Sequence, residues 1–262
     1  MLMDFSQFAA VLLDLDGTLY HEDHVLPGAV QLIARLHQEH RTFACLSNST
    51  ASPRQISQRL QRMGIQIDPD RIYPATEAVA TYVLEKYPPR PRIFNLATSG
   101  LQELLDGKVD WVTSVHEPCH AVIAGAPSSV YATEDRQRAA LLLLRNGAEL
   151  VGICADRVFP SPRGLELGTG ALCAMLAYAA NVNPTFCGKP EKAFFLTLCR
   201  KLGVDPARCV LIGDNPESDI AGAKQFHMST ILLLTGITRR DDLPKLPPHL
   251  RPDVVVNDLT EL

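Results

Sequence analysis

The sequence of 262 residues lacks a surplus of positive charge, since its 25 Lys and Arg face 29 Asp and Glu and its formal net charge is −4. A chain with this net charge does not attract nucleic acid electrostatically, so an anionic substrate must be held by individual charged or polar groups in its binding site. The N-terminal region lacks a basic segment, and its apolar stretch is only as long as a strand. We therefore expect no nucleic-acid partner, no signal peptide, no membrane span and a cytoplasmic location.

The seven cysteines lack the Cys-x-x-Cys spacing of zinc sites, and their odd number argues against a disulfide framework. Several lie inside apolar runs, as Cys45 does, so we expect buried thiols in a reducing compartment. The chain also lacks internal repeats and low-complexity tracts. With 46% hydrophobic and 21% charged residues, the composition is that of a globular protein.

The most informative stretch is Val11–Tyr20, in which an apolar run leads into Asp14 and Asp16. Side chains of a strand repeat their direction every second residue, so we expect these aspartates to face the same way. Two such carboxylates repel each other unless a cation, a shared proton or solvent offsets the repulsion. Gly17 then allows the backbone to approach a ligand, and Thr18 adds a hydroxyl. A strand that ends in an Asp-Gly turn is the simpler alternative.

Short apolar strands alternate with amphipathic helices along the chain, which predicts an α/β fold with a doubly wound parallel sheet. From about Pro74 the pattern changes to that of a smaller α/β unit, and the first pattern resumes after residue 180. We therefore predict a core formed by residues 1–74 and 181–262, with a second domain, residues 75–180, inserted into it.

Two later segments place charges where predicted strands end. Lys189 lies between a strand and a helix, although a surface lysine is the simpler alternative. Asp214 ends an apolar strand, and Asp219 follows at a helix start, where N-capping is the simpler role. In a parallel sheet Asp214 would lie beside Asp14, which brings four carboxylates to one rim. Such a cluster favours a hard divalent cation, and Mg²⁺ fits best because it takes few protein ligands and retains waters.

These segments together resemble the four-motif signature of haloacid dehalogenase (HAD) superfamily phosphatases. The insertion and the segments PATEA and GTGA resemble subclass IIA, which has a C2-type cap and includes p-nitrophenylphosphatase-like, phosphoglycolate, pyridoxal-phosphate, nucleotide and sugar phosphatases. The resemblance covers nearly the whole chain and implies a Rossmann-like HAD core with an inserted cap. The four motifs occur in the order DLDGTLY (14–20), SNST (47–50), GKP (188–190) and GDNPESDI (213–220).

The resemblance implies a role for each catalytic candidate. Asp14 would be the nucleophile that forms an aspartyl-phosphate intermediate. Asp16 would protonate the leaving alcohol and then activate the hydrolytic water. Ser47 would hydrogen-bond the transferring phosphoryl group, and Lys189 would neutralise its charge and hold Asp14.

The same resemblance implies a magnesium site. Mg²⁺ would be bound by Asp14, Asp214 and the backbone carbonyl of Asp16. Asp219 would hold the motif lysine or a metal-bound water, and Asn48 would support the site.

Two departures from the family pattern concern the substrate. Residues 47–49 are Ser-Asn-Ser where many relatives have Thr-Asn-Asn, and residues 154–158 replace a Thr-Asn-x-Asp or Thr-Asp-x-Asp segment. The loop that continues to Leu167 is where such phosphatases recognise the substrate, so no specific substrate is predicted. Arg157 and Arg163 are candidate contacts for a second anionic group, with plain surface charge as the alternative.

Other segments favour structural roles. His21 and His24 are expected in a solvated loop, and Pro118 spoils a helical pairing of His116 with His120. A phosphate-binding P-loop is excluded around residue 189, and the Gly-Thr-Gly run at 168–170 fails as a dinucleotide fingerprint.

The sequence thus predicts a Mg²⁺-dependent phosphomonoesterase of small phosphorylated metabolites, whose cap excludes water and selects the substrate. The alternatives are a non-catalytic binder of a phosphorylated ligand and a phosphotransferase to an acceptor other than water. Related caps often pair, so a homodimer through residues 75–180 is a further expectation.

Overall fold

The computed structural model describes residues 3–161 and 164–262. The chain divides into two compact units. The described residues of Met1–Ser47 form the first unit with Pro53–Tyr73 and Lys189–Leu262, and the second unit consists of Asn48–Ser52 and Pro74–Gly188. Within the described residues, no helix is long and apolar enough to cross a membrane.

The first unit is built on a six-stranded sheet with the strand order β15-β14-β13-β1-β4-β5. The central strand β1 pairs in parallel with β13 and β4, and all of its residues are buried. A continuous apolar run is what a parallel strand needs when both faces of its sheet are covered. The strand bounds are β1 (Ala10–Asp14), β4 (Phe43–Ser47), β5 (Ile72–Pro74), β13 (Cys209–Gly213), β14 (Ser229–Leu233) and β15 (Val254–Val256).

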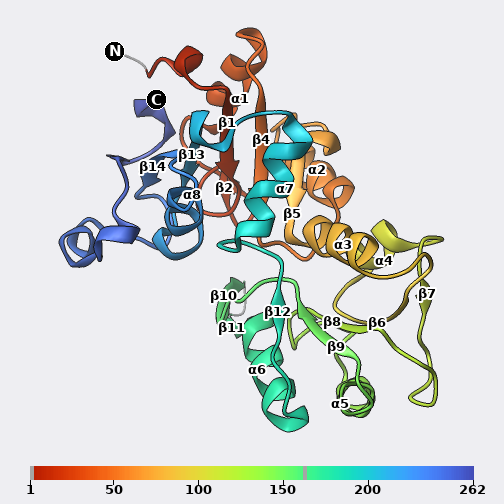
Figure 1. The fold of residues 1–262 in the computed structure, drawn as a ribbon. Coiled ribbons are helices and arrows are strands. Elements are labelled where there is room, and N and C mark those ends of the chain that lie inside the picture. Colours follow the sequence, from red (N-terminus) through yellow and green to blue (C-terminus); the bar gives the residue numbers. More distant parts are fainter. Residues whose placement is uncertain (1–2, 162–163) are drawn as a thin grey trace. The chain divides into compact units, whose positions relative to one another are not determined.

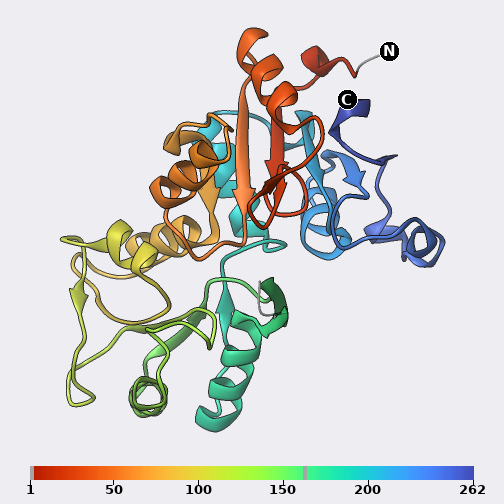
Figure 2. The same ribbon diagram turned by 180° about the vertical axis from the view of Figure 1, so that it is seen from behind.

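Helices lie on both faces of this sheet. Figure 1 shows α7 (Lys192–Leu202) and α8 (Ala221–Lys224) in front of it. Figure 2, seen from behind, shows α1 (Ala29–Gln38) and α2 (Pro53–Arg62) in front. The predicted α/β fold with a doubly wound parallel sheet is therefore confirmed.

The second unit has its own five-stranded parallel sheet, with the order β12-β9-β8-β6-β7. Helices α5 and α6 supply many of the apolar side chains that cover it. A short hairpin, β10 (Val158–Ser161) and β11 (Gly164–Leu167), completes the strands. The other bounds are α3 (Ala75–Lys86), β6 (Arg92–Leu96), α4 (Ser99–Leu105), β7 (Asp110–Trp111), β8 (Ala121–Ala124), α5 (Glu134–Arg145), β9 (Glu149–Gly152), α6 (Thr169–Ala180) and β12 (Thr185–Phe186).

The second unit extends further along the chain than the predicted insertion. Strand β12 pairs with β9, so the unit reaches Gly188, whereas the sequence pattern placed the end of the insertion at residue 180. Local periodicity identified this strand but not its partner, which is more than thirty residues away. The assignment of the two units as catalytic core and cap stays a prediction.

The loop after β7 has a structural role. Glu117 pairs with Arg92 and accepts the backbone N–H of Ser114 at 2.9 Å, while His120 Nδ1 accepts the N–H of Arg92 at 2.9 Å. These side-chain bonds offer the backbone an alternative to the sheet ladder beyond β7, which is only two residues long. His116 is exposed, and His120 holds the loop in place through its hydrogen bond with the backbone of Arg92.

The seven cysteines all lie in the described part of the chain and form no disulfide there. All except Cys119 are buried, as their apolar surroundings predict.

Glu149 joins β9 to neighbouring elements through four donors. Burial raises the pKa of Glu149, but the hydrogen bonds that it accepts outweigh this effect and bring its pKa to about 2, from an ordinary value of 4.5. The donors are Lys86 Nζ and Tyr82 hydroxyl, each at 2.7 Å, Thr185 hydroxyl at 2.8 Å, and Tyr87 hydroxyl.

We expect Glu149→Gln to lower the free energy of unfolding by roughly 1–3 kcal/mol at pH 7, because it weakens a group of bonds to one ionised acceptor. The folded carboxylate has the lower pKa, so this stabilisation is present above pH 4.5 and is lost as pH falls from 4.5 toward 2. Denaturant unfolding of both proteins at neutral and acidic pH measures the difference. Glu134→Gln, whose side chain is exposed, is the control; a difference independent of pH would contradict the assignment.

Candidate active site

Three parallel strands of the first unit end at one edge of its sheet, and a buried polar residue lies at the end of each strand. Asp14 ends β1, Ser47 ends β4, and Asp214 follows β13. The parallel register pairs Leu13 with Ile212, which brings Asp14 and Asp214 to neighbouring strand ends. The structure thus brings together these side chains as the sequence pattern predicts.

Lys189 lies inside this cluster. Its Nζ donates to Asp14 Oδ1 at 2.5 Å and to Asp219 Oδ1 at 2.6 Å, and its side chain is only 3% exposed. The surface-lysine alternative is therefore wrong. Burial lowers the pKa of Lys189, but the two carboxylates outweigh it and raise the pKa well above the usual range. The lysine is a permanent cation within the site.

Asp219 does not cap a helix. Its Oδ1 accepts from Lys189, and its Oδ2 accepts the backbone N–H of Asn215 at 3.1 Å. The capping role belongs to Asn215, whose side chain accepts the N–H groups of Glu217 and Ser218 at the start of the helical segment Pro216–Ile220. The simpler role considered for Asp219 is thus wrong, and the residue belongs to the charged cluster.

Carboxyl groups outnumber cations in the cluster. Three buried aspartates, Asp14, Asp214 and Asp219, surround one buried lysine, so full ionisation would leave two negative charges uncompensated (three minus one). Burial raises the pKa of Asp14 well above its usual range, and burial with the nearby Asp219 raises the pKa of Asp214 to about 7. One ligand oxygen from each carboxylate lies within 4.8 Å of the others. This oxygen set fits a hard divalent cation.

Within the described residues, this is the one group of three such side chains that could hold a metal ion. His21 and His24 are exposed and lie in a small hairpin of β2 (Tyr20–His21) and β3 (His24–Val25), in accord with the expected solvated loop.

Asp16 follows Asp14 two residues beyond the end of β1. Its side chain reaches solvent, and its Oδ2 accepts the Tyr20 hydroxyl at 3.1 Å. The surrounding protein still raises the pKa of Asp16, because it removes part of the water that stabilises the charged form. A carboxyl group with a raised pKa and access to solvent suits a general acid.

Sequence reasoning missed the segment Thr235–Thr238, which follows β14 and holds Asp214 in place. The N–H of Ile237 donates to Asp214 Oδ2 at 2.9 Å, and the Thr238 hydroxyl donates to the Asp214 carbonyl at 2.9 Å. A Cβ at Gly236 would lie 1.8 Å from Asp214 Oδ2. The available signal was the small and polar run after an apolar strand, since β14 pairs in parallel with β13.

Gly17 also packs against the Asp214 carboxylate. Its φ of +79° is in the left-handed region, and a Cβ there would lie 2.6 Å from Asp214 Cγ. Its N–H donates to the Tyr20 carbonyl at 2.8 Å and its carbonyl accepts the Thr235 hydroxyl at 2.5 Å. Gly17 therefore forms a tight turn that leaves room for Asp214.

Asn48 lies in the second unit, where its amide donates to both carboxylate oxygens of Asp156 at 3.1 and 3.2 Å. Asp156 was also missed as a named candidate, although its loop was singled out. The Gly-Thr-Gly run packs against this loop: a Cβ at Gly168 would lie 2.2 Å from the Asp156 carbonyl oxygen, and one at Gly170 2.4 Å from that of Ala155. Close packing explains these glycines without a dinucleotide.

The hydrogen bonds described above for the cluster involve neither of the two arginine candidates, and Arg157 belongs to the second unit. Arg157 is exposed, and Arg163 lies outside the described residues. Their contact with a substrate stays a prediction.

Comparison with known proteins gives matches over nearly the whole chain. A haloacid dehalogenase-like hydrolase model matches residues 11–108, and a HAD-hydrolase-like model matches residues 186–262. The chain is 30% identical to an acid sugar phosphatase of Staphylococcus aureus, over 97% of this chain and 96% of that protein. It is 33% identical to human haloacid dehalogenase-like hydrolase domain-containing protein 2, over 92% and 90% of the two chains.

Solved structures agree with these matches. A 4-nitrophenylphosphatase from Thermotoga maritima superimposes with a TM-score of 0.89 at 27% identity, covering 98% of this chain and 97% of that one. The fold is also that of a glycerol phosphate phosphatase from Mycobacterium tuberculosis solved with magnesium, with a TM-score of 0.90 at 23% identity, covering 100% and 78%. These relatives fit the subclass that the sequence motifs indicate.

Proposed function

Because the chain belongs to the haloacid dehalogenase-like hydrolases and is a phosphoric monoester hydrolase of small phosphorylated substrates, we propose that it uses Mg²⁺ and an aspartyl-phosphate on Asp14. The observation that supports this proposal is the buried Asp14 carboxylate, held 2.5 Å from Lys189 within a cluster of three aspartates that could hold a metal ion. The named phosphatases among its relatives argue against the non-catalytic alternative.

The metal would be held by Asp14, Asp214 and the backbone carbonyl of Asp16, with Asp219 beside them. Bound Mg²⁺ would neutralise phosphoryl oxygens and keep the carboxylates ionised. Lys189 supplies the remaining positive charge and fixes the orientation of Asp14 through the 2.5 Å hydrogen bond.

The reaction would proceed in two in-line displacements. A carboxylate oxygen of Asp14 attacks phosphorus and forms the acyl-phosphate bond, while the bond from phosphorus to the substrate alcohol breaks. Asp16, whose pKa is raised by burial, donates a proton to the departing oxygen. Asp16 then takes a proton from the water that attacks the acyl phosphate, which releases inorganic phosphate and restores Asp14. Ser47 would donate a hydrogen bond to the transferring group.

Phosphate release tests the proposal. The panel consists of p-nitrophenyl phosphate, sugar phosphates, glycerol phosphate, phosphoglycolate, pyridoxal phosphate and nucleotides, each assayed with Mg²⁺ and with EDTA. We expect hydrolysis of small esters that stops with EDTA and returns with added Mg²⁺. Release that persists in EDTA would contradict the metal requirement, and transfer of phosphate to an added alcohol in place of water would indicate a phosphotransferase. The cytoplasmic location and a homodimer through residues 75–180 stay predictions.

Gly17→Ala tests how Asp214 contributes to metal binding. We expect Mg²⁺ affinity to fall roughly tenfold to a hundredfold, because the new methyl group must displace the Asp214 carboxylate. The measurement is the Mg²⁺ concentration needed to raise the thermal unfolding midpoint. Gly64→Ala is the matched control, since Gly64 has a similar φ of +85° and no atom within 4 Å of an added Cβ. Equal Mg²⁺ dependence of the two variants would contradict this role.

A further inference from the structure

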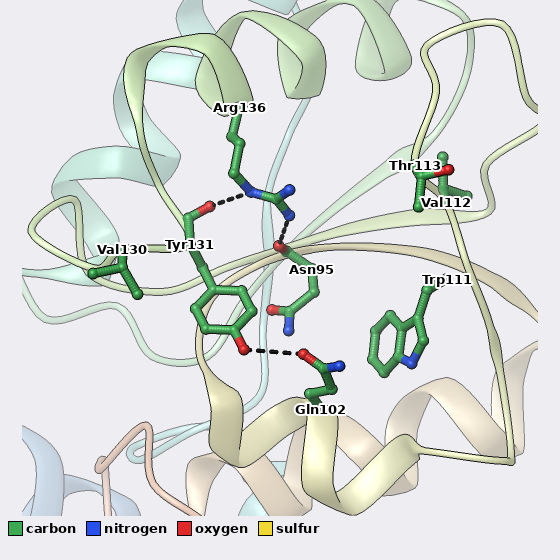
Figure 3. A pocket seen from close by; sticks show the side chains of 8 residues that line it. All are labelled: Asn95, Gln102, Trp111, Val112, Thr113, Val130, Tyr131 and Arg136. Carbon is green, nitrogen blue, oxygen red and sulfur yellow. Dashed lines mark hydrogen bonds between the residues drawn. The ribbon is translucent and has the colours of Figure 1, made fainter.

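The second unit contains a pocket of about 420 Å³ that the proposed catalysis does not use (Figure 3). Its polar and aromatic lining includes Asn95, Gln102, Trp111, Tyr131 and Arg136. All of these residues belong to the second unit, whereas the aspartate and lysine cluster belongs to the first. The volume falls in the range of sites that hold small organic ligands.

The pocket lies where the topology of an open parallel sheet favours ligand binding. From β6 the chain proceeds to β7 on one side, and then returns to β8 on the other side of β6. Ligands of such sheets bind beyond the carboxyl ends of the strands, where the direction of winding reverses. Asn95 lies near the end of β6, Trp111 ends β7, and Tyr131 lies in the connection after β8. Gln102 and Arg136 lie in the first turns of α4 and α5.

The pocket carries one positive charge without a negative partner. Arg136 Nε donates to the Tyr131 carbonyl at 2.8 Å, and Nη2 donates to the Asn95 carbonyl at 2.6 Å, as Figure 3 shows. Both acceptors are uncharged, and no carboxylate of the described residues pairs with this guanidinium. The Arg136 side chain also lies over the Phe94 ring, 4.7 Å from its centroid, and is half-buried. A ligand with a single negative charge would complete this arrangement.

The side-chain oxygens of the two pocket amides already accept hydrogen bonds, and the Asn95 amide nitrogen donates to the Thr98 carbonyl at 2.9 Å. Asn95 Oδ1 accepts two backbone N–H groups, and Gln102 Oε1 accepts the Tyr131 hydroxyl at 2.9 Å. The indole N–H of Trp111 is buried and has no acceptor among the described residues. Figure 3 shows the amides of Asn95 and Gln102 in the space between the rings of Tyr131 and Trp111. A ligand here must therefore supply acceptor oxygens and a surface suited to aromatic contact.

We propose that this pocket binds a small aromatic carboxylate. The carboxylate supplies the single negative charge and the acceptor oxygens for Arg136 and the Gln102 amide. The aromatic ring contacts Trp111 and Tyr131, which line the same pocket.

Trp111 is the only tryptophan of the chain, so intrinsic fluorescence reports on this pocket directly. We expect benzoate to cause a saturable change in fluorescence, and uncharged benzamide to bind roughly tenfold or more weakly. Arg136→Gln should weaken benzoate binding by a similar factor. Arg138→Gln, on the same helix with a side chain that is 67% exposed, should bind benzoate as the unaltered protein does.

A second variant and two other anions complete the binding test. Gln102→Leu removes an amide donor from a residue exposed on α4, and should weaken benzoate binding even if Arg136→Gln does not fold. Acetate and inorganic phosphate test whether the aromatic ring matters. The proposal is overturned if benzoate gives no saturable change up to roughly 10 mM, if benzamide binds equally well, or if phosphate binds as tightly as benzoate.

Discussion

Asp14→Asn is expected to lower the turnover of p-nitrophenyl phosphate by on the order of 10⁴-fold or more, because an amide does not attack phosphorus as a carboxylate does. The variant should still fold. Asparagine has nearly the same shape, and its amide oxygen can accept the hydrogen bond that Lys189 donates to Asp14 Oδ1. Steady-state phosphate release measures the loss, and thermal unfolding measures the integrity of the fold.

Asp23→Asn provides the matched control for this experiment. Asp23 lies soon after the same motif, but its side chain is 81% exposed and pairs with Arg59 at 3.3 Å. We expect its turnover to remain within a small factor of that of the unaltered protein. An Asp14→Asn variant with full activity would exclude Asp14 as the nucleophile.

Lys189→Met is expected to reduce both activity and stability. Turnover should fall by on the order of 10³-fold, because the cation that holds Asp14 and neutralises the phosphoryl group is lost. The free energy of unfolding without Mg²⁺ should fall by about 3–5 kcal/mol, because three buried carboxylates remain without their lysine. Added Mg²⁺ should recover part of the stability but not the turnover.

The control is Lys192→Met, an exposed lysine at the start of α7. It should leave turnover and the unfolding midpoint nearly unchanged. If Lys189→Met behaved in the same way, the two hydrogen bonds from Lys189 Nζ would have neither catalytic nor structural importance.

The sequence predicts the meeting of Asp14 with Asp214 because both follow apolar strands, and parallel strands end at one edge of a sheet. This inference needs only local patterns and one topological rule. The motif resemblance and the relatives extend it to the phosphatase family.

The environment of Lys189 could not be predicted from local patterns. Its partner Asp14 lies 175 residues away, and the lysine becomes a buried cation only because both carboxylates converge on it. For Asp219, a helix start suggests capping, but Asn215 takes that role and leaves Asp219 for Lys189. Long-range contacts decided both cases.

The hydrogen bonds that hold Asp214 in place could not be predicted from local patterns either. Thr238 and Ile237 reach it only because β14 lies beside β13, and nothing in their own spacing indicates a contact. The extent of the second unit depends in the same way on the pairing of β12 with β9. Local sequence patterns predict that a segment forms a strand. Which strand it pairs with depends on how the whole sheet packs.

In the proposed mechanism, Asp14 carries the phosphoryl group between substrate and water. Acid quenching during turnover of a ³²P-labelled phosphomonoester, followed by mapping of the labelled peptide, tests it most directly. We expect hydroxylamine-sensitive label on the peptide that contains Asp14 when Mg²⁺ is present, and no label in Asp14→Asn. Label on another residue, or label on Asp14 that forms equally well in EDTA, would contradict it.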